Sequence, residues 1–427
     1  MRIKVKNGLL VLLLVVFVGC NTSSKKDQQT TMEENDTEVK EMTAAEILGN
    51  PEYLAMSYGG YRHVDHDIEP TIEELKEDMK LMSALGVRIV RTYKVHLPQA
   101  ANLLQAIDEL KKEDASFEMY VMLGAWIDCK NAWTDLEPDH AVESEANKPQ
   151  IEEAARLANA YPDIVKVIAV GNEAMVHWAA TYFVQPSVIL KWVTYLQDLK
   201  AANKLPKDLW ITSSDDFSSW GGGGAEYHTE DLEKLYDAVD YVSMHTYPYH
   251  NTHYNPEFWI IEDDEKLTDI EKVDAAMLRA RDFAKAQYDS VAGYMKSIGV
   301  KKPIHIGETG WATKSNGFYG ETGSRATDEY KAGRYYKLMR EWTNKAGISC
   351  FYFEGFNEPW KDDKNPLGSE NHFGLFTVEG QAKYALWEMV DDGVFSELSR
   401  NGNAISKTFD GNKESLMTTV FAPPTKE

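Results

Sequence analysis

Two glutamates in the sequence follow short apolar runs and could share acid and base chemistry. Glu173 ends the stretch "IVKVIAVGNE", and Glu308 ends the stretch "PIHIGE". When two carboxylates face each other, one can be kept protonated while the other stays ionised, which is what breaking a glycosidic bond requires. A single glutamate at a strand end would more often cap a helix or pair with an arginine such as Arg88 or Arg91. Here there are two such glutamates, each closely preceded by a glycine, and this favours a catalytic pair.

The elements that must position this pair alternate along the chain. From residue 51 onward, short runs of β-branched or aromatic residues alternate with longer amphipathic stretches, a pattern typical of repeated βα units. The predicted strands are "YLAMSY" from Tyr53, "VRIVRTY" from Val87, "FEMYVML" from Phe117, "IVKVIAV" from Ile164, "LWITS" from Leu209, "VDYVSM" from Val239, "PIHIG" from Pro303 and "SCFYF" from Ser349. The predicted helices cover residues 71–86, 100–112, 150–160, 187–202, 270–298, 325–346 and 381–397.

This alternation predicts an α/β fold of the (β/α)8 TIM-barrel type over residues 44–400. The active site of such a barrel lies at the carboxyl ends of its strands. Glu173 and Glu308, which follow the fourth and seventh predicted strands, would therefore lie at the mouth of the barrel, where their side chains can point towards each other. Asn172 would lie beside Glu173 and suits the binding of a sugar 2-hydroxyl.

Four motifs carry a resemblance to a known family. "VGNE", "GETGW", "FYFEGFNEPWK" and "HFGLF" occur in this order, and with weaker agreement at "MSYGG", "VRTY" and "HTYPYH" the chain resembles glycoside hydrolase family 17 over roughly residues 53–390. The resemblance implies a clan A-type barrel and retaining cleavage of β-1,3-glucan without a cofactor. It also implies that Glu173 is the acid/base and Glu308 the nucleophile.

Further candidates for substrate binding lie at strand ends or within these motifs. They are Asn172, Tyr58, Tyr93, Tyr247, Trp311, Glu358, Lys361 and Glu370. The resemblance implies that the last three, two carboxylates and a lysine, stand beside the site. The three tyrosines end the first, second and sixth predicted strands, where each fits a sugar contact and a core position equally well, and Tyr247 could also orient the nucleophile.

Tryptophans follow several predicted strands. They are Trp126, Trp220, Trp259, Trp311 and Trp360. Because the faces of a sugar ring are apolar, a glucan groove needs exposed aromatic rings, and we expect some of these five to stack on glucose. Any single one of them is more often a core residue.

Two groups of histidines have no spacing typical of a metal site. His63 and His66 form one group, and His245, His250 and His253 form the other. Neither matches a zinc motif such as HExxH, and a mechanism with two carboxylates needs no metal. We therefore expect no catalytic metal.

The N-terminus has the features of an export signal. In "MRIKVKNGLLVLLLVVFVGC" basic residues precede a short apolar run, and a glycine precedes Cys20. The sequence predicts a signal peptide over residues 1–19, lipidation of Cys20 and a flexible tether over residues 20–43, with a C-terminal tail over residues 401–427. The alternatives are a cleaved signal peptide without a lipid and an uncleaved anchor. We expect an exported bacterial lipoprotein of the cell envelope, held at the membrane by its lipid, with Asn21 compatible with sorting to the outer membrane.

The two remaining cysteines give no disulfide framework. Cys129 and Cys350 lie in segments that look like strands or strand ends. A disulfide between them is one possibility in an exported protein, but two buried free thiols are the better interpretation.

The charge balance narrows the class of partner. The chain has 45 Lys and Arg against 68 Asp and Glu, a formal net charge of -23, which repels nucleic acid and anionic lipid surfaces. A neutral β-glucan chain fits better. The sequence thus favours a monomeric, endo-acting β-1,3-glucanase of the laminarinase kind. Two alternatives stay open: a β-1,3-glucanosyltransferase that uses the same glutamates, and a non-catalytic glycan-binding lipoprotein.

Overall fold

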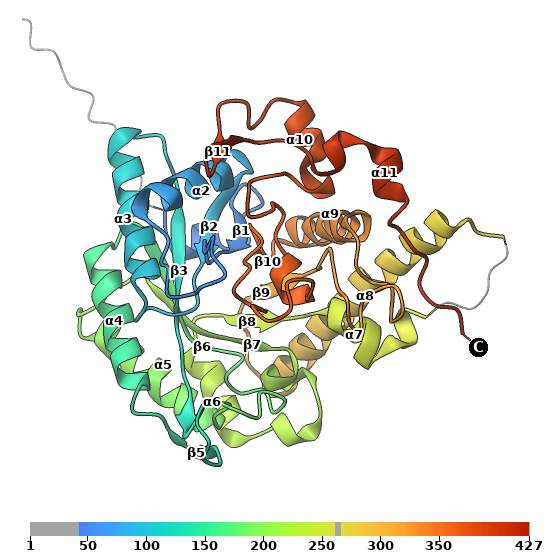
Figure 1. Ribbon diagram of the computed structural model, residues 1–427. Coiled ribbons are helices and arrows are strands. Elements are labelled where there is room, and N and C mark those ends of the chain that lie inside the picture. The colour runs from blue at the N-terminus through green and yellow to red at the C-terminus, as the bar shows by residue number, and fades with distance from the viewer. Residues whose placement is uncertain (1–41, 261–265, 427) are drawn as a thin grey trace, which may run out of the picture. The chain divides into compact units, whose positions relative to one another are not determined.

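The computed structural model describes residues 42–260 and 266–426, and these residues contain the predicted (β/α)8 barrel (Figure 1). Eight strands close in the order β1-β10-β9-β8-β7-β6-β3-β2, and every neighbouring pair is parallel. The strands are β1 (Leu54–Ser57), β2 (Val87–Arg91), β3 (Tyr120–Ala125), β6 (Val165–Asn172), β7 (Trp210–Asp216), β8 (Val242–His245), β9 (Ile304–Gly310) and β10 (Cys350–Phe353). All eight correspond to predicted strands, and the fold class is confirmed.

Most predicted helices are present, with capping residues that explain their starts. The main helices are α2 (Ile72–Ala84), α3 (Pro98–Glu113), α4 (Asn147–Ala160), α5 (Pro186–Ala201), α8 (Asp269–Ser297) and α9 (Glu329–Ala346). Thr71 and Glu74 form a capping box at the start of α2, and Asp328 caps α9, so that α9 begins later than predicted. The short helices α6 (Glu230–Ala238) and α7 (Pro248–Tyr254) were not predicted.

The prediction of one helix over 381–397 is wrong. This segment contains a single 3-10 turn, Tyr384–Leu386, and the short helix α10 (Trp387–Asp391). Its first residues are extended because Ala382 forms bridges with Phe376 and Lys407. Gly393 has a φ of 74°, a left-handed conformation in which a helix cannot continue.

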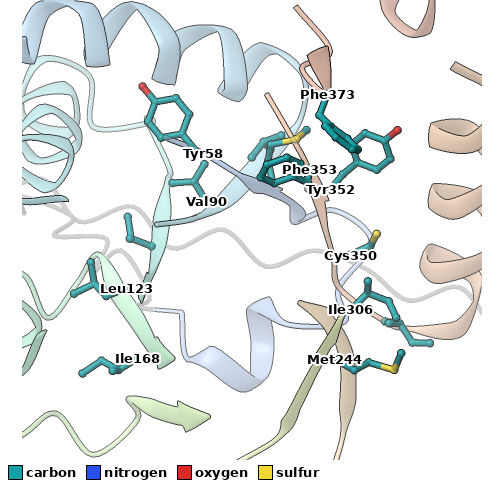
Figure 2. Packing of buried hydrophobic residues seen from close by; sticks show 14 of the residues in the cluster. Tyr58, Val90, Leu123, Ile168, Met244, Ile306, Cys350, Tyr352, Phe353 and Phe373 are labelled. Atoms are coloured by element: carbon teal, nitrogen blue, oxygen red, sulfur yellow. The ribbon is translucent and has the colours of Figure 1, made fainter. Parts of the chain in front are cut away.

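The side chains of each barrel strand alternate between two environments. Val90, Leu123, Ile168 and Ile306 belong to the large apolar cluster between the strands and the helices (Figure 2). Their neighbours along the strands point to the inside, where the lower layer is apolar and includes Ile89, Met122, Val167, Tyr241 and Phe351. Cys129 and Cys350 are both buried free thiols, as predicted.

The upper layer inside the barrel is polar. Arg91 lies two residues after Ile89, on the same inner face of β2. Ser243 and His245 lie two and four residues after Tyr241 and point to the same side as Tyr241. All three polar side chains are buried. Buried polar groups need hydrogen-bond partners. The side chains of this layer therefore bond to the groups at the mouth of the barrel and hold them in position.

The residues after 400, predicted as a C-terminal tail, pack on the barrel. Strands β11 (Ser399–Arg400) and β12 (Asn403–Ala404) form a small sheet, and α11 (Lys413–Met417) buries Leu416. The Arg400 guanidinium pairs with the buried Asp78 carboxylate of α2 at 2.8 Å. A boundary at residue 400 would cut through this packing.

The N-terminal predictions fall largely outside the described residues. The signal peptide, Cys20 and nearly all of the tether lie within residues 1–41. The described chain starts with α1 (Ala44–Ile47), which Thr43 and Glu46 cap. Among the helices of residues 42–260 and 266–426, we find none with the length and apolar character needed to cross a membrane.

Candidate active site

The backbone at the end of β6 is shaped to deliver Glu173 to the mouth of the barrel. Gly171 has a φ of 82° and Glu173 a φ of 47°, both left-handed. A Cβ on Gly171 would lie 2.8 Å from the Cβ of Ala174, so only glycine fits there. The Glu173 amide donates to the carbonyl oxygen of Ser214 at 3.0 Å, which holds the residue in this conformation. A strained non-glycine residue of this kind is typical of functional sites.

Glu173 and Glu308 lie close together, as the strand pattern predicts. One carboxylate oxygen of each glutamate and one ring nitrogen of His245 all lie within 4.8 Å of one another. The carboxyl groups of retaining glycosidases are about 5 to 5.5 Å apart, whereas inverting enzymes need roughly 6.5 to 9.5 Å to admit a water. An approach of two carboxylate oxygens to within 4.8 Å is compatible with the retaining arrangement.

Glu308 is surrounded by groups that favour its ionised form. The Arg91 guanidinium donates to Oε2 at 2.9 Å, the Tyr93 hydroxyl donates to Oε2 at 2.7 Å, and the Tyr247 hydroxyl donates to Oε1 at 2.6 Å. Burial by itself would raise the pKa of Glu308, but the Arg91 charge and the two hydroxyl donors hold it below its usual value. The pair therefore includes one carboxylate that stays charged.

Glu173 has the opposite electrostatic environment. Burial raises the pKa of this carboxyl well above its usual value, and the nearby charges of Glu308 and Asp216 raise it further. No arginine or lysine pairs with the Glu173 carboxyl among the described residues; its ring partner is His245, with Nδ1 3.0 Å from Oε1. Glu173 is thus suited to hold a proton at neutral pH, and Glu308 to lose one.

His245 orients Glu173 without adding a charge. Burial lowers the pKa of His245 to about 4, so the ring is neutral near pH 7. Arg91 can only donate, so its Nη1, 3.2 Å from His245 Nε2, makes this nitrogen an acceptor. The proton of the neutral ring is then on Nδ1 and is donated to Glu173 Oε1. The other oxygen of Glu173 is left to carry the catalytic proton, and Arg91 is the permanent positive charge of the site.

The prediction missed the roles of Arg91 and His245. Arg91 was considered only as a structural partner of a glutamate, and His245 only as part of a possible metal site that the spacing did not support. A polar side chain on the inner face at the end of a barrel strand was the signal that could have found both. Glu173, His245 and Glu308 do form a group with metal-ligand spacing within the described residues. However, the Arg91 charge lies 2.9 Å from Glu308 and opposes a cation there.

Of the three residues expected beside the site, Glu358 and Lys361 form a second charge cluster, together with the buried Glu354. Lys361 Nζ lies 3.4 Å from Glu354 Oε2 and 3.3 Å from Glu358 Oε2. Glu358 also accepts from the Tyr61 amide at 3.1 Å. Glu370 is exposed, and its charge contributes to the raised pKa of Glu173. Glu354, one residue after β10, was not among the predicted residues.

Two predicted substrate contacts are wrong, because the side chains are buried. Tyr58 is 1% exposed, and its hydroxyl donates to Asp78 at 3.0 Å. Trp311 is fully buried, with its indole donating to the carbonyl oxygen of Ala326 at 2.8 Å. Trp220 and Trp259 are equally buried, so these three tryptophans belong to the core.

Other predicted residues do face the site. Tyr93 and Tyr247 contact Glu308, and Asn172 accepts from Arg91 at 2.5 Å. The binding of a sugar 2-hydroxyl by Asn172 stays a prediction. Trp126 and Trp360 are the two members of the predicted set that keep part of their surface exposed.

Two solved structures of β-1,3-glucan enzymes resemble the chain to different degrees. The chain is similar to an endo-laminarinase from Formosa Hel1_33_131, with 63% identity, a TM-score of 0.90 and coverage of 90% of this chain and 98% of that one. It also shares the fold of a glycoside hydrolase family 17 β-1,3-glucanosyltransferase from Rhizomucor miehei, at 19% identity and a TM-score of 0.52, over 78% of this chain and 96% of that one.

Comparisons with curated proteins give more distant relatives. A glucan 1,3-beta-glucosidase of Arthroderma benhamiae is 24% identical over 59% of this chain and 68% of its own length. The glucan endo-1,3-beta-glucosidase btgC of Emericella nidulans is 23% identical over 79% of this chain, which spans 46% of that protein. The family model of the BtgE/BtgC glycoside hydrolase domain matches residues 55–374. The chain therefore belongs to the BtgE/BtgC glycoside hydrolase family, of the glycoside hydrolase family 17 type, and the prediction of a glycosidase is confirmed.

Proposed function

We propose that the protein is a retaining β-1,3-glucanase that cuts within laminarin-type chains. The observation that carries this proposal is the pairing of Glu308, whose pKa is lowered, with Glu173, whose pKa is raised, at a separation that fits the retaining mechanism. The substrate and the internal position of the cut are supported by the 63% identity to a protein described as an endo-laminarinase.

Each glutamate has one role in each half of the reaction. The Glu308 carboxylate attacks the anomeric carbon while Glu173 gives its proton to the departing glycosidic oxygen, which leaves a glycosyl ester on Glu308. Glu173, now ionised, removes a proton from water, and the resulting oxygen attacks the same carbon and releases Glu308. The two displacements restore the β-configuration. Tyr93 and Tyr247 stabilise the Glu308 carboxylate before the attack and after the release.

Product analysis tests this function. With laminarin and short β-1,3-gluco-oligosaccharides as substrates, we expect oligosaccharides of several lengths from the start of the reaction. Proton NMR should detect the β-anomer first, because two displacements retain the configuration. An initial α-anomer would contradict the retaining assignment. Products longer than the starting oligosaccharide, formed at low substrate concentration, would instead identify a glucanosyltransferase, and binding without cleavage would identify a glycan-binding protein.

We further propose that Cys20 is lipidated and that the monomeric enzyme is tethered in this way to the cell envelope, with Asn21 favouring the outer membrane. The support is the basic start, the short apolar run and the glycine before Cys20 in the sequence. Replacing Cys20 by Ala should move the enzyme from the membrane fraction to the soluble fraction without loss of specific activity. A variant that still fractionates with membranes would disprove the lipid anchor.

A further inference from the structure

A β-hairpin is inserted between β3 and α4, outside the eight βα units of the barrel. Its strands are β4 (Cys129–Lys130) and β5 (Asp139–Glu143). It is attached to the loop that follows Glu173. The Cys129 amide donates to the carbonyl oxygen of Tyr182 at 3.0 Å, and the Gln185 amide donates to that of His140 at 3.1 Å. The hairpin therefore extends the rim of the barrel on the side of the acid/base residue.

Trp133 in the turn of this hairpin is fixed in place but exposed. Its ring stacks on Tyr182, with centroids 4.9 Å apart and an interplanar angle of 21°, yet the residue is 59% exposed. Tyr182 in turn packs on Trp126 at 5.4 Å. Both indole nitrogens donate to Asp128 Oδ1, from Trp126 at 2.6 Å and from Trp133 at 3.1 Å. One face and the polar edge of Trp133 are thus engaged, and its other face is open to solvent.

The backbone of Trp133 is in an unfavourable conformation. Its φ is 62°, and that of Asn131 in the same turn is 67°. For a bulky residue such a φ is an outlier, and exposing an indole ring to water brings no gain in stability. Strained residues persist where neighbouring contacts hold them, and they concentrate at ligand-binding sites. The contacts with Tyr182 and Asp128 hold the strained Trp133 in a position where only a ligand can cover its open face.

We infer that Trp133, backed by Tyr182 and Trp126, is a sugar-binding platform for a glucosyl unit remote from the bond that is cut. This inference rests on the proposed function. The apolar C–H face of a glucose ring matches a flat indole, and a rigid aromatic ring binds it with little loss of conformational freedom. A neutral glucan is also not repelled by the net charge of -23. The hairpin therefore favours chains long enough to reach from Glu173 to Trp133.

The test uses a length series of β-1,3-gluco-oligosaccharides together with laminarin. Replacing Trp133 by Ala should lower kcat/KM about tenfold on laminarin and on the longest oligosaccharides, through KM and not kcat. The shortest oligosaccharide that is cleaved does not reach the platform. Its kcat/KM should therefore stay within about twofold of the wild-type value. Trp133→Tyr keeps an aromatic ring and should retain most of the activity on long chains.

Leu136→Ala is the matched control. Leu136 is 64% exposed in the same turn and has an apolar side chain without a ring, so its loss should change neither kcat nor KM on any substrate. Isothermal titration calorimetry with laminarihexaose on the inactive Glu308→Ala protein, with and without Trp133→Ala, should give the same weakening of Kd as the kinetics.

The possible outcomes distinguish a failure of the platform inference from a failure of the proposed function. If the wild-type protein cleaves β-1,3-glucan and Trp133→Ala leaves long chains unaffected, or lowers kcat equally on all lengths, the platform is disproved and the function stands. If the loss occurs equally in Leu136→Ala, the hairpin has only a structural role and the platform is also disproved. If the wild-type protein cleaves no β-1,3-glucan at all, the proposed function fails, and the platform inference fails with it.

Discussion

Replacing Glu308 by Ala is expected to lower kcat on laminarin by about 10⁵-fold. The variant has no carboxylate to attack the anomeric carbon. The Arg91 guanidinium loses its Glu308 partner and cannot act as a nucleophile in its place. Tyr93 and Tyr247 lose their acceptor but stay in place on their own elements. The substrate should still bind, and isothermal titration calorimetry should measure that binding while reducing-sugar assays detect no product.

Azide should restore turnover in this variant. A small anion fits the space that Glu308 leaves, attacks the anomeric carbon from the same side, and displaces the leaving group, which still receives its proton from Glu173. The product should therefore be an α-glycosyl azide, detectable by NMR. Glu308→Gln is the matched control, because its side chain fills the same space and should prevent rescue. Recovery of a β-azide would mean that Glu308 is not the nucleophile.

Replacing Glu173 by Ala is expected to lower kcat on laminarin by about 10³-fold, since general acid–base catalysis of this kind contributes roughly 10² to 10⁴. Aryl glycosides with a good leaving group should still glycosylate Glu308, because they need little protonation. Azide should then release the sugar as a β-glycosyl azide by attacking from the side where Glu173 stood. If the configurations were exchanged, with a β-azide from Glu308→Ala and an α-azide from Glu173→Ala, the two roles would be reversed.

The pH profile of the same variant gives an independent measurement. In the wild-type enzyme, activity is lost on the alkaline side as Glu173 loses its proton, and the raised pKa of Glu173 moves this limb upward. Activity is lost on the acid side as Glu308 gains a proton, and the lowered pKa of Glu308 moves that limb downward. On activated substrates, Glu173→Ala should remove the alkaline limb of kcat/KM and keep the acid limb. A profile with both limbs unchanged would contradict the assignment of Glu173.

The sequence by itself determined the barrel and the position of the catalytic pair. Eight apolar runs that alternate with amphipathic stretches predict eight parallel strands, and the carboxyl ends of parallel barrel strands all lie at one mouth. Glu173 and Glu308 follow two such runs, so their convergence is a consequence of topology alone. The left-handed conformation of Gly171 could also be predicted, because a glycine between a strand and a loop indicates a left-handed turn.

The tertiary structure decided which carboxyl is charged and which aromatic residues are free. A pKa depends on burial and on charges within a few ångströms. Arg91 reaches the glutamates from the end of β2, and His245 and Tyr247 reach them from the end of β8 and the residues just after it, far away in sequence. For the same reason Trp311, which was expected at the mouth of the barrel, lies in the core, whereas the exposed Trp133 was not among the predicted residues. A tryptophan after a strand can turn into the core or out to solvent, and only the packing of neighbouring elements, such as the inserted hairpin and Tyr182, determines which one happens.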